Sequence, residues 1–175
     1  MRGARLQPIL FIPVVCNSER LLENMVLALD RFDHAILEAL ATNARISITD
    51  LARVIGLTKT PTQARLKRLE TEGVILGYRA QLNAAALGLD HIAFVQVRLS
   101  DTRDAALKAF NAAVAKVAEI EQCHMIAANF DYLLKVRTRD IAAYRRVMGE
   151  RISTLPNVVS TSTFVAMESV KEEAI

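Results

Sequence analysis

The chain has 175 residues, of which 52% are hydrophobic and 23% are charged, which excludes an intrinsically disordered chain and allows one ordinary domain or two small ones. The formal net charge of +3 is small, so nucleic-acid binding must be argued from local clusters of positive charge. No apolar run is long enough to span a membrane, and Cys16 and Cys123 form no disulfide framework, so a cytoplasmic location is expected.

Residues 1–28 are expected to be a disordered extension, or to result from a translation start assigned too far upstream. The apolar stretch PILFIPVVC follows two arginines, as in a secretory signal, but Pro13 interrupts it and no small-residue cleavage site follows. Met25 is therefore the preferred start of translation.

Residues 29–73 predict three short helices. Asp30 is the expected N-cap of the first helix, which has an apolar stripe at helical spacing: Phe32, Ile36, Leu37 and Leu40. Ser47 is expected to cap the second helix, whose buried face holds Ile48, Leu51, Ala52 and Ile55. Gly56 ends this helix and Pro61 suits the first turn of the next, so the pair predicts a helix-turn-helix.

The second helix of such a pair enters the major groove of DNA, so its two faces should differ. Helical geometry predicts that four residues share the face toward the core: Thr62, Leu66, Leu69 and Gly73. The residues expected to contact DNA lie opposite this face or on its flanks: Lys59, Thr60, Gln63, Ala64, Arg65, Lys67 and Arg68. Glutamine and threonine can pair with base edges, while lysine and arginine neutralise phosphates. The plainer alternative is a solvated helix in a bundle.

Residues 74–89 are expected to be a β linker, because residues 74–82 alternate in hydropathy and a short helical turn follows, from Asn83 to Gly88. In residues 90–170, strands are expected at 91–99, 120–127, 132–138 and 158–170, with helices at 105–118 and from Asp140 to before Pro156. The predicted class is α+β: an N-terminal winged-type helix-turn-helix domain plus a C-terminal ferredoxin-like βαββαβ domain.

Three stretches of the chain resemble the Lrp/AsnC (feast/famine) family of bacterial and archaeal transcription regulators. They are LDRFDHAILEAL, ARISITDLARVIGLTKTPTQARLKRLETEGVILGYRAQLN and EIEQCHMIAANFDYLLKVRTRDIAAYRRVMGERISTLPNV. The third is similar to the leucine-responsive regulators and to activators of proline catabolism. The resemblance extends over both domains, in the family's order.

This resemblance implies that the N-terminal domain binds double-stranded DNA as a dimer, and that the C-terminal domain makes homodimers that assemble into tetramers or octamers. It also implies an amino-acid effector, with proline or leucine favoured, bound near the turn between the second and third strands of the C-terminal domain. The turn residues are Ala128, Asn129, Phe130 and Asp131. Asp131 is expected to hold the effector's α-ammonium, the alternative being an aspartate that shapes the turn by binding its own backbone.

No pattern predicts a catalytic residue, a metal site or a cofactor. Cys123 and His124 are neighbours in a strand and point to opposite faces, and no nucleophile motif or glycine-rich phosphate loop is found. Together with the resemblance, this favours a regulator of amino-acid metabolism genes that is not an enzyme. The alternative is a metabolite-binding protein or enzyme on a ferredoxin-like fold without DNA binding, which steep salt dependence of nucleic-acid binding would distinguish.

Overall fold

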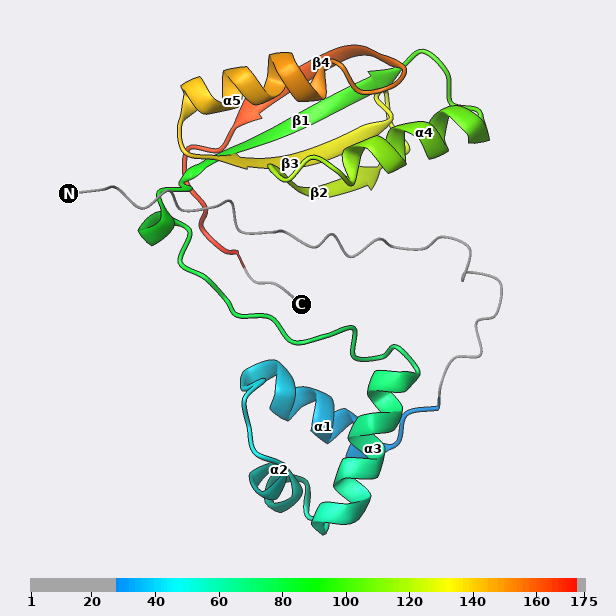
Figure 1. Cartoon of the computed structure of the whole chain (residues 1–175), viewed down its shortest axis with the longest axis vertical. Coiled ribbons are helices and arrows are strands. Elements are labelled where there is room, and N and C mark those ends of the chain that lie inside the picture. Colours follow the sequence, from blue (N-terminus) through cyan, green and yellow to red (C-terminus); the bar gives the residue numbers. More distant parts are fainter. Residues whose placement is uncertain (1–27, 173–175) are drawn as a thin grey trace, which may run out of the picture. The chain divides into compact units, whose positions relative to one another are not determined.

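A computed structural model describes residues 28–172, which divide into two units, residues 28–82 and residues 83–172. The expectation for residues 1–28 therefore lies, apart from Ala28, outside the described residues. The first unit contains three helices, α1 (Arg31–Thr42), α2 (Ile48–Ile55) and α3 (Lys59–Thr71) (Figure 1). These are the three helices that the sequence predicts.

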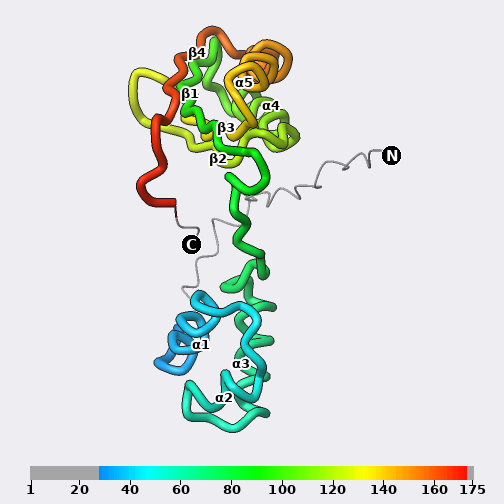
Figure 2. The backbone as a smooth tube through the Cα atoms, turned by 90° about the vertical axis from the view of Figure 1, so that its left-hand side faces the viewer, coloured from blue at the N-terminus to red at the C-terminus, as the bar shows by residue number. Residues whose placement is uncertain are grey.

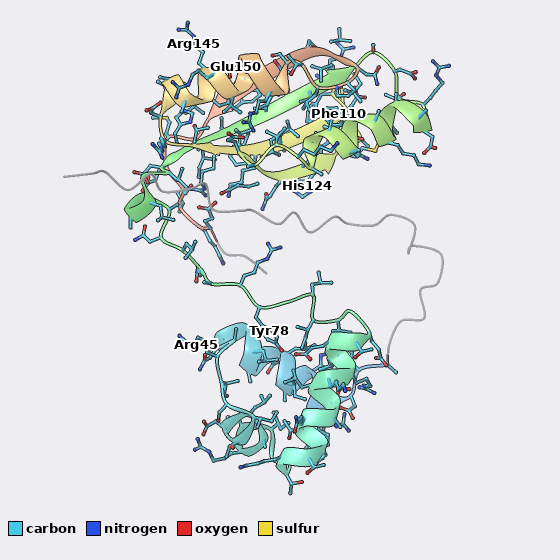
Figure 3. The ribbon with its side chains drawn as sticks, in the orientation of Figure 1. Arg45, Tyr78, Phe110, His124, Arg145 and Glu150 are labelled. Atoms are coloured by element: carbon cyan, nitrogen blue, oxygen red, sulfur yellow. The ribbon has the colours of Figure 1, made fainter. Side chains whose placement is uncertain are left out.

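The predicted β linker is wrong, because residues 76–82 adopt no regular secondary structure (Figure 2). Their alternating pattern has no neighbouring strand to pair with, and a strand needs a partner for its backbone hydrogen bonds. No wing is therefore built within residues 28–82. Tyr78 instead fastens this segment to the end of α3 by donating a hydrogen bond to Glu70 over 2.8 Å (Figure 3). The short helical turn is confirmed as η2 (Ala85–Leu87).

Local capping determines where the first two helices begin and end, as predicted. The Asp30 carboxylate accepts from the backbone N–H groups of Phe32 and Asp33, at 2.8 and 3.0 Å. Ser47 caps α2 by accepting from the N–H of Asp50 over 3.1 Å. Gly56 then ends α2 in the left-handed region at φ 74°, which turns the chain into α3.

The small core of this unit is built mainly from one residue of α1, two of α2 and one of α3: Ile36, Leu51, Ile55 and Leu69. Thr62 and Leu69 are fully buried and Leu66 is half-buried, which confirms the predicted inner face of α3. The placement of Gly73 on that face is wrong. The helix ends at Thr71, and Gly73 lies in an exposed turn with φ 72°.

A carboxylate, Asp33, is buried beside this core with 1% of its side chain exposed. It accepts hydrogen bonds from Arg65 Nη1 at 3.0 Å and from Arg68 Nη2 at 2.6 Å, and Arg65 also contacts Asp30 at 2.7 Å. Both arginines belong to α3, while both carboxylates lie at the start of α1. These four residues, the Asp33 clamp, therefore fix the rotation of α3 against α1.

The second unit is a four-stranded antiparallel sheet with two helices, α4 (Asp104–Val114) and α5 (Ile141–Val147). A π-helical turn, η3 (Met148–Ile152), extends α5. The strands are β1 (His91–Leu99), β2 (Ile120–Met125), β3 (Tyr132–Thr138) and β4 (Val158–Val165), in the order β2-β3-β1-β4. This order confirms the ferredoxin-like prediction, with the last strand shorter than expected.

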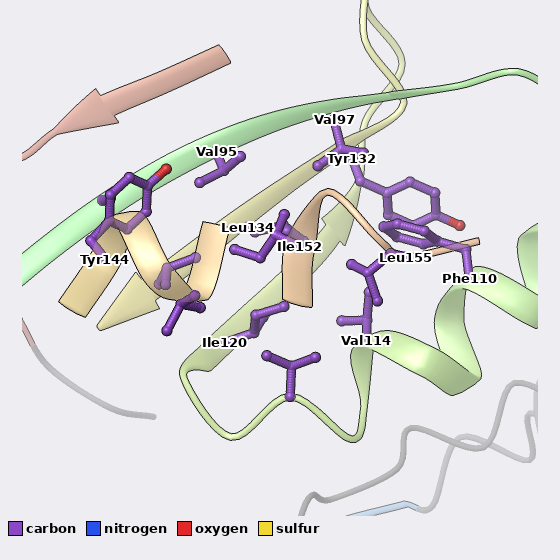
Figure 4. Packing of buried hydrophobic residues seen from close by; sticks show 14 residues of the cluster. Val95, Val97, Phe110, Val114, Ile120, Tyr132, Leu134, Tyr144, Ile152 and Leu155 are labelled. Carbon is purple, nitrogen blue, oxygen red and sulfur yellow. The ribbon is translucent and has the colours of Figure 1, made fainter. Parts of the chain in front are cut away.

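Both helices cover the same face of this sheet (Figure 4). Alternate strand residues such as Val95 and Leu134 are fully buried there. The ring centroids of Phe110, from α4, and Tyr132 are 4.5 Å apart. The intervening residues lie on the opposite face, which we call the open face. There the side chains of β1 and β4 stand opposite one another, as in the pair Phe94 and Phe164.

Replacing Gly56 by alanine should destabilise α2 and α3 by about 1 to 2 kcal/mol, because a Cβ disfavours the left-handed backbone even though it would meet no atom within 4 Å. Amide hydrogen exchange of the full chain, followed by mass spectrometry, should show faster exchange in peptides from α2 and α3. Gly149→Ala is the matched control, since this glycine also has free space but no positive φ. Equal exchange in the two variants would contradict the backbone argument.

Replacing Asp33 by asparagine should lower the free energy of unfolding of the first unit by roughly 2 to 3 kcal/mol, because two guanidinium groups lose the charge that they face. A urea titration of the full chain, read by amide exchange in peptides from α1 to α3, would measure this loss. Asp50→Asn removes the carboxylate from an exposed ion pair with Arg53 and should have a much smaller effect. Similar midpoints for the two variants would show that the clamp does not stabilise the unit.

Candidate nucleic-acid interface and effector site

The outer face of α3 presents most of the residues that the sequence assigns to DNA contact. The exposed ones are Lys59, Thr60, Gln63, Ala64 and Lys67. They begin in the first turn of the helix, directly after the turn that Gly56 starts. A row with two ammonium groups, a hydroxyl and an amide can contact both phosphates and base edges.

The two arginines of the predicted set, Arg65 and Arg68, differ from the rest. Both are half-buried and bound to Asp33, so their first role is to hold α3 in place. The hydrogen bonds that Arg65 donates to the carboxylates of Asp30 and Asp33 raise the pKa of Arg65 above its usual value. The backbone N–H of Asp33 and the side chain of Arg65 hold the pKa of Asp30 below its usual value. Arg65 and Asp30 therefore remain charged at neutral pH.

The Asp33 clamp is the part of this site that sequence reasoning did not find. The only signal was a second aspartate three residues after the N-cap, next to an apolar stripe. Local spacing explains this residue as part of a capping box. Asp33 does complete that box, since its carboxylate accepts from the N–H of Asp30 at 3.1 Å. Its partners on α3 lie 32 and 35 residues further along the chain.

The turn assigned to the effector joins β2 to β3, and Asp131 fastens it to the end of β1. The carboxylate of Asp131 accepts from the backbone N–H of Leu99 at 2.7 Å, and its own N–H donates to the carbonyl of Val97 at 2.9 Å. This arrangement fits the turn-shaping alternative for Asp131, except that the carboxylate binds the backbone of β1 rather than that of the turn. The turn is thereby held beside the open face.

A polar hollow of about 260 Å³ lies where this turn meets the open face. Two of the predicted effector residues, Asn129 and Phe130, line it, whereas Ala128 is exposed on the turn outside its lining. The other lining residues come from β1 and β4: Gln96, Arg98, Ser160 and Ser162. Sequence reasoning did not find these four residues, because the two strands are far apart in the chain.

The described part of the chain offers little support for a metal site, a reactive thiol or a membrane span. Within residues 28–172, no three His, Cys, Asp or Glu side chains are grouped so that they could hold a metal ion. Burial raises the pKa of Cys123 to about 11, so this thiol stays protonated at neutral pH and is a poor nucleophile. No helix in the same range is long and apolar enough to cross a membrane.

Comparison with known proteins agrees with this geometry. Residues 29–70 match the AsnC-type helix-turn-helix domain, and residues 92–175 match the Lrp/AsnC ligand binding domain. The chain is 63% identical over 147 residues to the proline dehydrogenase transcriptional activator of Rhizobium radiobacter, covering 84% of this chain and 94% of the relative. It is 43% identical over 144 residues to the leucine-responsive regulatory protein of Escherichia coli (strain K12), covering 82% and 88%.

A solved structure shares the fold of both units. A transcriptional regulator from Neisseria meningitidis, in complex with L-Met, aligns with a TM-score of 0.76 and 28% sequence identity, over 82% of this chain and 93% of that chain. The helix-turn-helix, the ferredoxin-like sheet and the similarity over both units lead to one conclusion. The chain belongs to the Lrp/AsnC family of DNA-binding transcription regulators and is not an enzyme.

Proposed function

We propose that this chain binds specific DNA sites through the outer face of α3, and that an amino acid bound by its second unit changes this binding. The observation that carries the proposal is the exposed polar row on a helix whose rotation is fixed by ion pairs to a buried carboxylate. A helix held in this way presents the same side chains to DNA each time, which sequence-specific contact requires.

The row supports a division of roles along α3. Lys59 and Lys67 suit phosphate oxygens, while Thr60 and Gln63 suit base edges and Ala64 suits the methyl group of thymine. The side chains of Arg65 and Arg68 remain 28% and 40% exposed. A guanidinium has five N–H donors, so each arginine can also offer one to a phosphate while it binds Asp33.

The effector is proposed to be an apolar amino acid, with proline first and leucine second. The name of the Rhizobium radiobacter relative refers to proline dehydrogenase, that of the Escherichia coli relative to leucine, and the Neisseria meningitidis regulator was solved with L-Met. The proposed site is the turn made by Ala128, Asn129, Phe130 and Asp131, two of which line the polar hollow. The regulated genes are proposed to serve amino-acid metabolism.

Assembly is proposed to connect the two sites. A homodimer presents two copies of α3, and tetramers or octamers present more, so the spacing of these helices selects the spacing of DNA half-sites. An amino acid that binds one assembly better than another shifts the population toward it and changes DNA affinity.

Replacing Lys67 by alanine should weaken binding to all DNA sequences similarly, and should reduce the slope of log affinity against log salt by about one for each protomer in contact. Gln63→Ala should instead change the preference among sequences by about 1 to 3 kcal/mol per base pair. Fluorescence anisotropy with a fragment from upstream of the protein's own gene, and with a scrambled fragment, would measure both. Lys116→Ala, an exposed lysine of the second unit, is the control. Unchanged binding in both test variants would mean that α3 does not face DNA.

Proline or leucine should change the affinity for the specific fragment by about fivefold or more, the usual size of such coupling. The same anisotropy titration, repeated with each amino acid and with glycine as a control, would show it. Binding no stronger than to the scrambled fragment, at every salt concentration, would favour the metabolite-binding alternative.

A further inference from the structure

The chain does not leave the second unit at the end of β4. The backbone N–H of Ala166, the next residue, still donates to the carbonyl of Ile92 in β1 over 2.9 Å. The chain then crosses the sheet, because the carboxylate of Glu172 lies against β3, which is on the other side of β1 from β4. Figure 1 shows this segment, in red, passing the start of β1. We call residues 166–172 the C-terminal strap.

Burial along the open face shows where the strap covers it. Ile92 stands opposite Arg137, and Phe94 stands opposite Lys135, so these four side chains belong to the open face. Ile92 is nevertheless only 4% exposed, whereas Phe94, two residues further along β1, is 37% exposed. The open face is therefore covered at the end where β1 begins and is more exposed beyond it.

Two cations of β3 hold the strap by its carboxylate. Glu172 pairs with Lys135 and, at 2.6 Å, with Nη2 of Arg137. Both cations also pair with Glu121 of β2. Only 13% of the Lys135 side chain and 11% of the Arg137 side chain are exposed, so salt screens these pairs weakly. The cluster contains two positive and two negative charges, and removal of Glu172 leaves one positive charge in excess.

Arg137 connects this cluster to the linker that leads into the second unit. Its Nη1 donates to the backbone carbonyl of Leu89 over 3.1 Å, while its Nε faces Glu121 and its Nη2 faces Glu172. Leu89 closes the η2 turn, because its own N–H donates to the carbonyl of Ala84 over 2.9 Å. The guanidinium is planar, so it cannot rotate away from the strap without also disturbing its hydrogen bond to the linker.

We infer that the C-terminal strap is a latch for the linker. Glu172 fixes the guanidinium of Arg137, and Arg137 is a positioning residue that fixes the point where the linker enters the second unit. The part of the inference that concerns DNA rests on the proposed function, in which two copies of α3 bind two half-sites. A latched linker limits how far apart these helices can move, so the strap limits the half-site spacings that the protein accepts.

Amide hydrogen exchange of the full-length protein, followed by mass spectrometry, tests the latch. In Glu172→Gln, peptides that cover residues 83–90 should exchange about fivefold faster than in the wild type, because the hydrogen bonds of the η2 turn open more often. Glu172→Asp keeps the charge on a shorter side chain and should recover part of the protection. Glu168→Gln is the matched control, since Glu168 is an exposed carboxylate of the same strap, whereas Arg137 binds Glu121 and Glu172. It should exchange like the wild type.

Arg137→Lys tests the positioning role of the guanidinium. Lysine keeps the charge that Glu172 and Glu121 face, but its single ammonium group lacks the rigid fork that also reaches the carbonyl of Leu89. Residues 83–90 should therefore exchange faster in this variant too, while peptides from α4 should exchange as in the wild type. Equal acceleration in α4 and in residues 83–90 would show a general loss of stability, and would overturn the latch.

The consequence for DNA is measured by fluorescence anisotropy with the upstream fragment, after footprinting has located its half-sites. Inserting half a helical turn, about five base pairs, between the half-sites should weaken binding by the wild type about tenfold, because the two helices no longer reach both sites on one side of the duplex. Glu172→Gln should lose about threefold or less, since its freed linker reaches the displaced site. Glu168→Gln should behave like the wild type.

Three results would overturn the inference in distinguishable ways. Equal exchange of Glu172→Gln and Glu168→Gln in residues 83–90 would show that the strap does not hold the linker. Faster exchange with an unchanged spacing preference would overturn the limit on half-site spacing alone. Absence of specific DNA binding by the wild type would overturn the proposed function, while the exchange experiment would still decide whether the latch exists.

Discussion

The contact between the buried carboxylate of Asp33 and the two arginines of α3 is the constraint on which the proposed DNA-reading surface depends. The helix has 13 residues, but the buried apolar cluster receives only Leu69 from it, with Leu66 packed alongside, so apolar packing by itself constrains the helix at few positions. Directional, charge-assisted hydrogen bonds do not tolerate rotation or sliding of the helix, because their geometry is lost within a fraction of an ångström. The clamp thus converts an amphipathic helix into one with a defined outer face.

This constraint also explains why the positive charges of α3 are unequal. Two arginines neutralise a carboxylate inside the unit, and the lysines remain in solvent. Arginine ion pairs can keep a fixed geometry, because the planar guanidinium loses less freedom for each hydrogen bond that it makes. The flexible lysines are better suited to phosphates, whose positions vary less with base sequence than the base edges do.

The second unit uses its sheet in two ways. One face is sealed by α4 and α5 over a core in which Phe110 and Tyr132 pack together. The other face remains open and carries polar side chains, including the guanidinium of Arg98. The turn between β2 and β3 is tied to β1 by Asp131, so a ligand in the hollow would contact a pinned turn and two strands.

The sequence by itself determined the features that depend on neighbouring residues. Capping side chains set the starts of α1 and α2, Gly56 set the turn, and short apolar runs with partial alternation set β1 and β3, because each of these signals acts within a few residues. Only the tertiary structure decided the rest. The alternation of residues 74–82 did not produce a strand, because no other strand pairs with this segment. Asp33 binds arginines of another helix, and Arg98 lies opposite Ser160 of another strand. These outcomes depend on which distant segments become neighbours, and local periodicity carries no information about that choice.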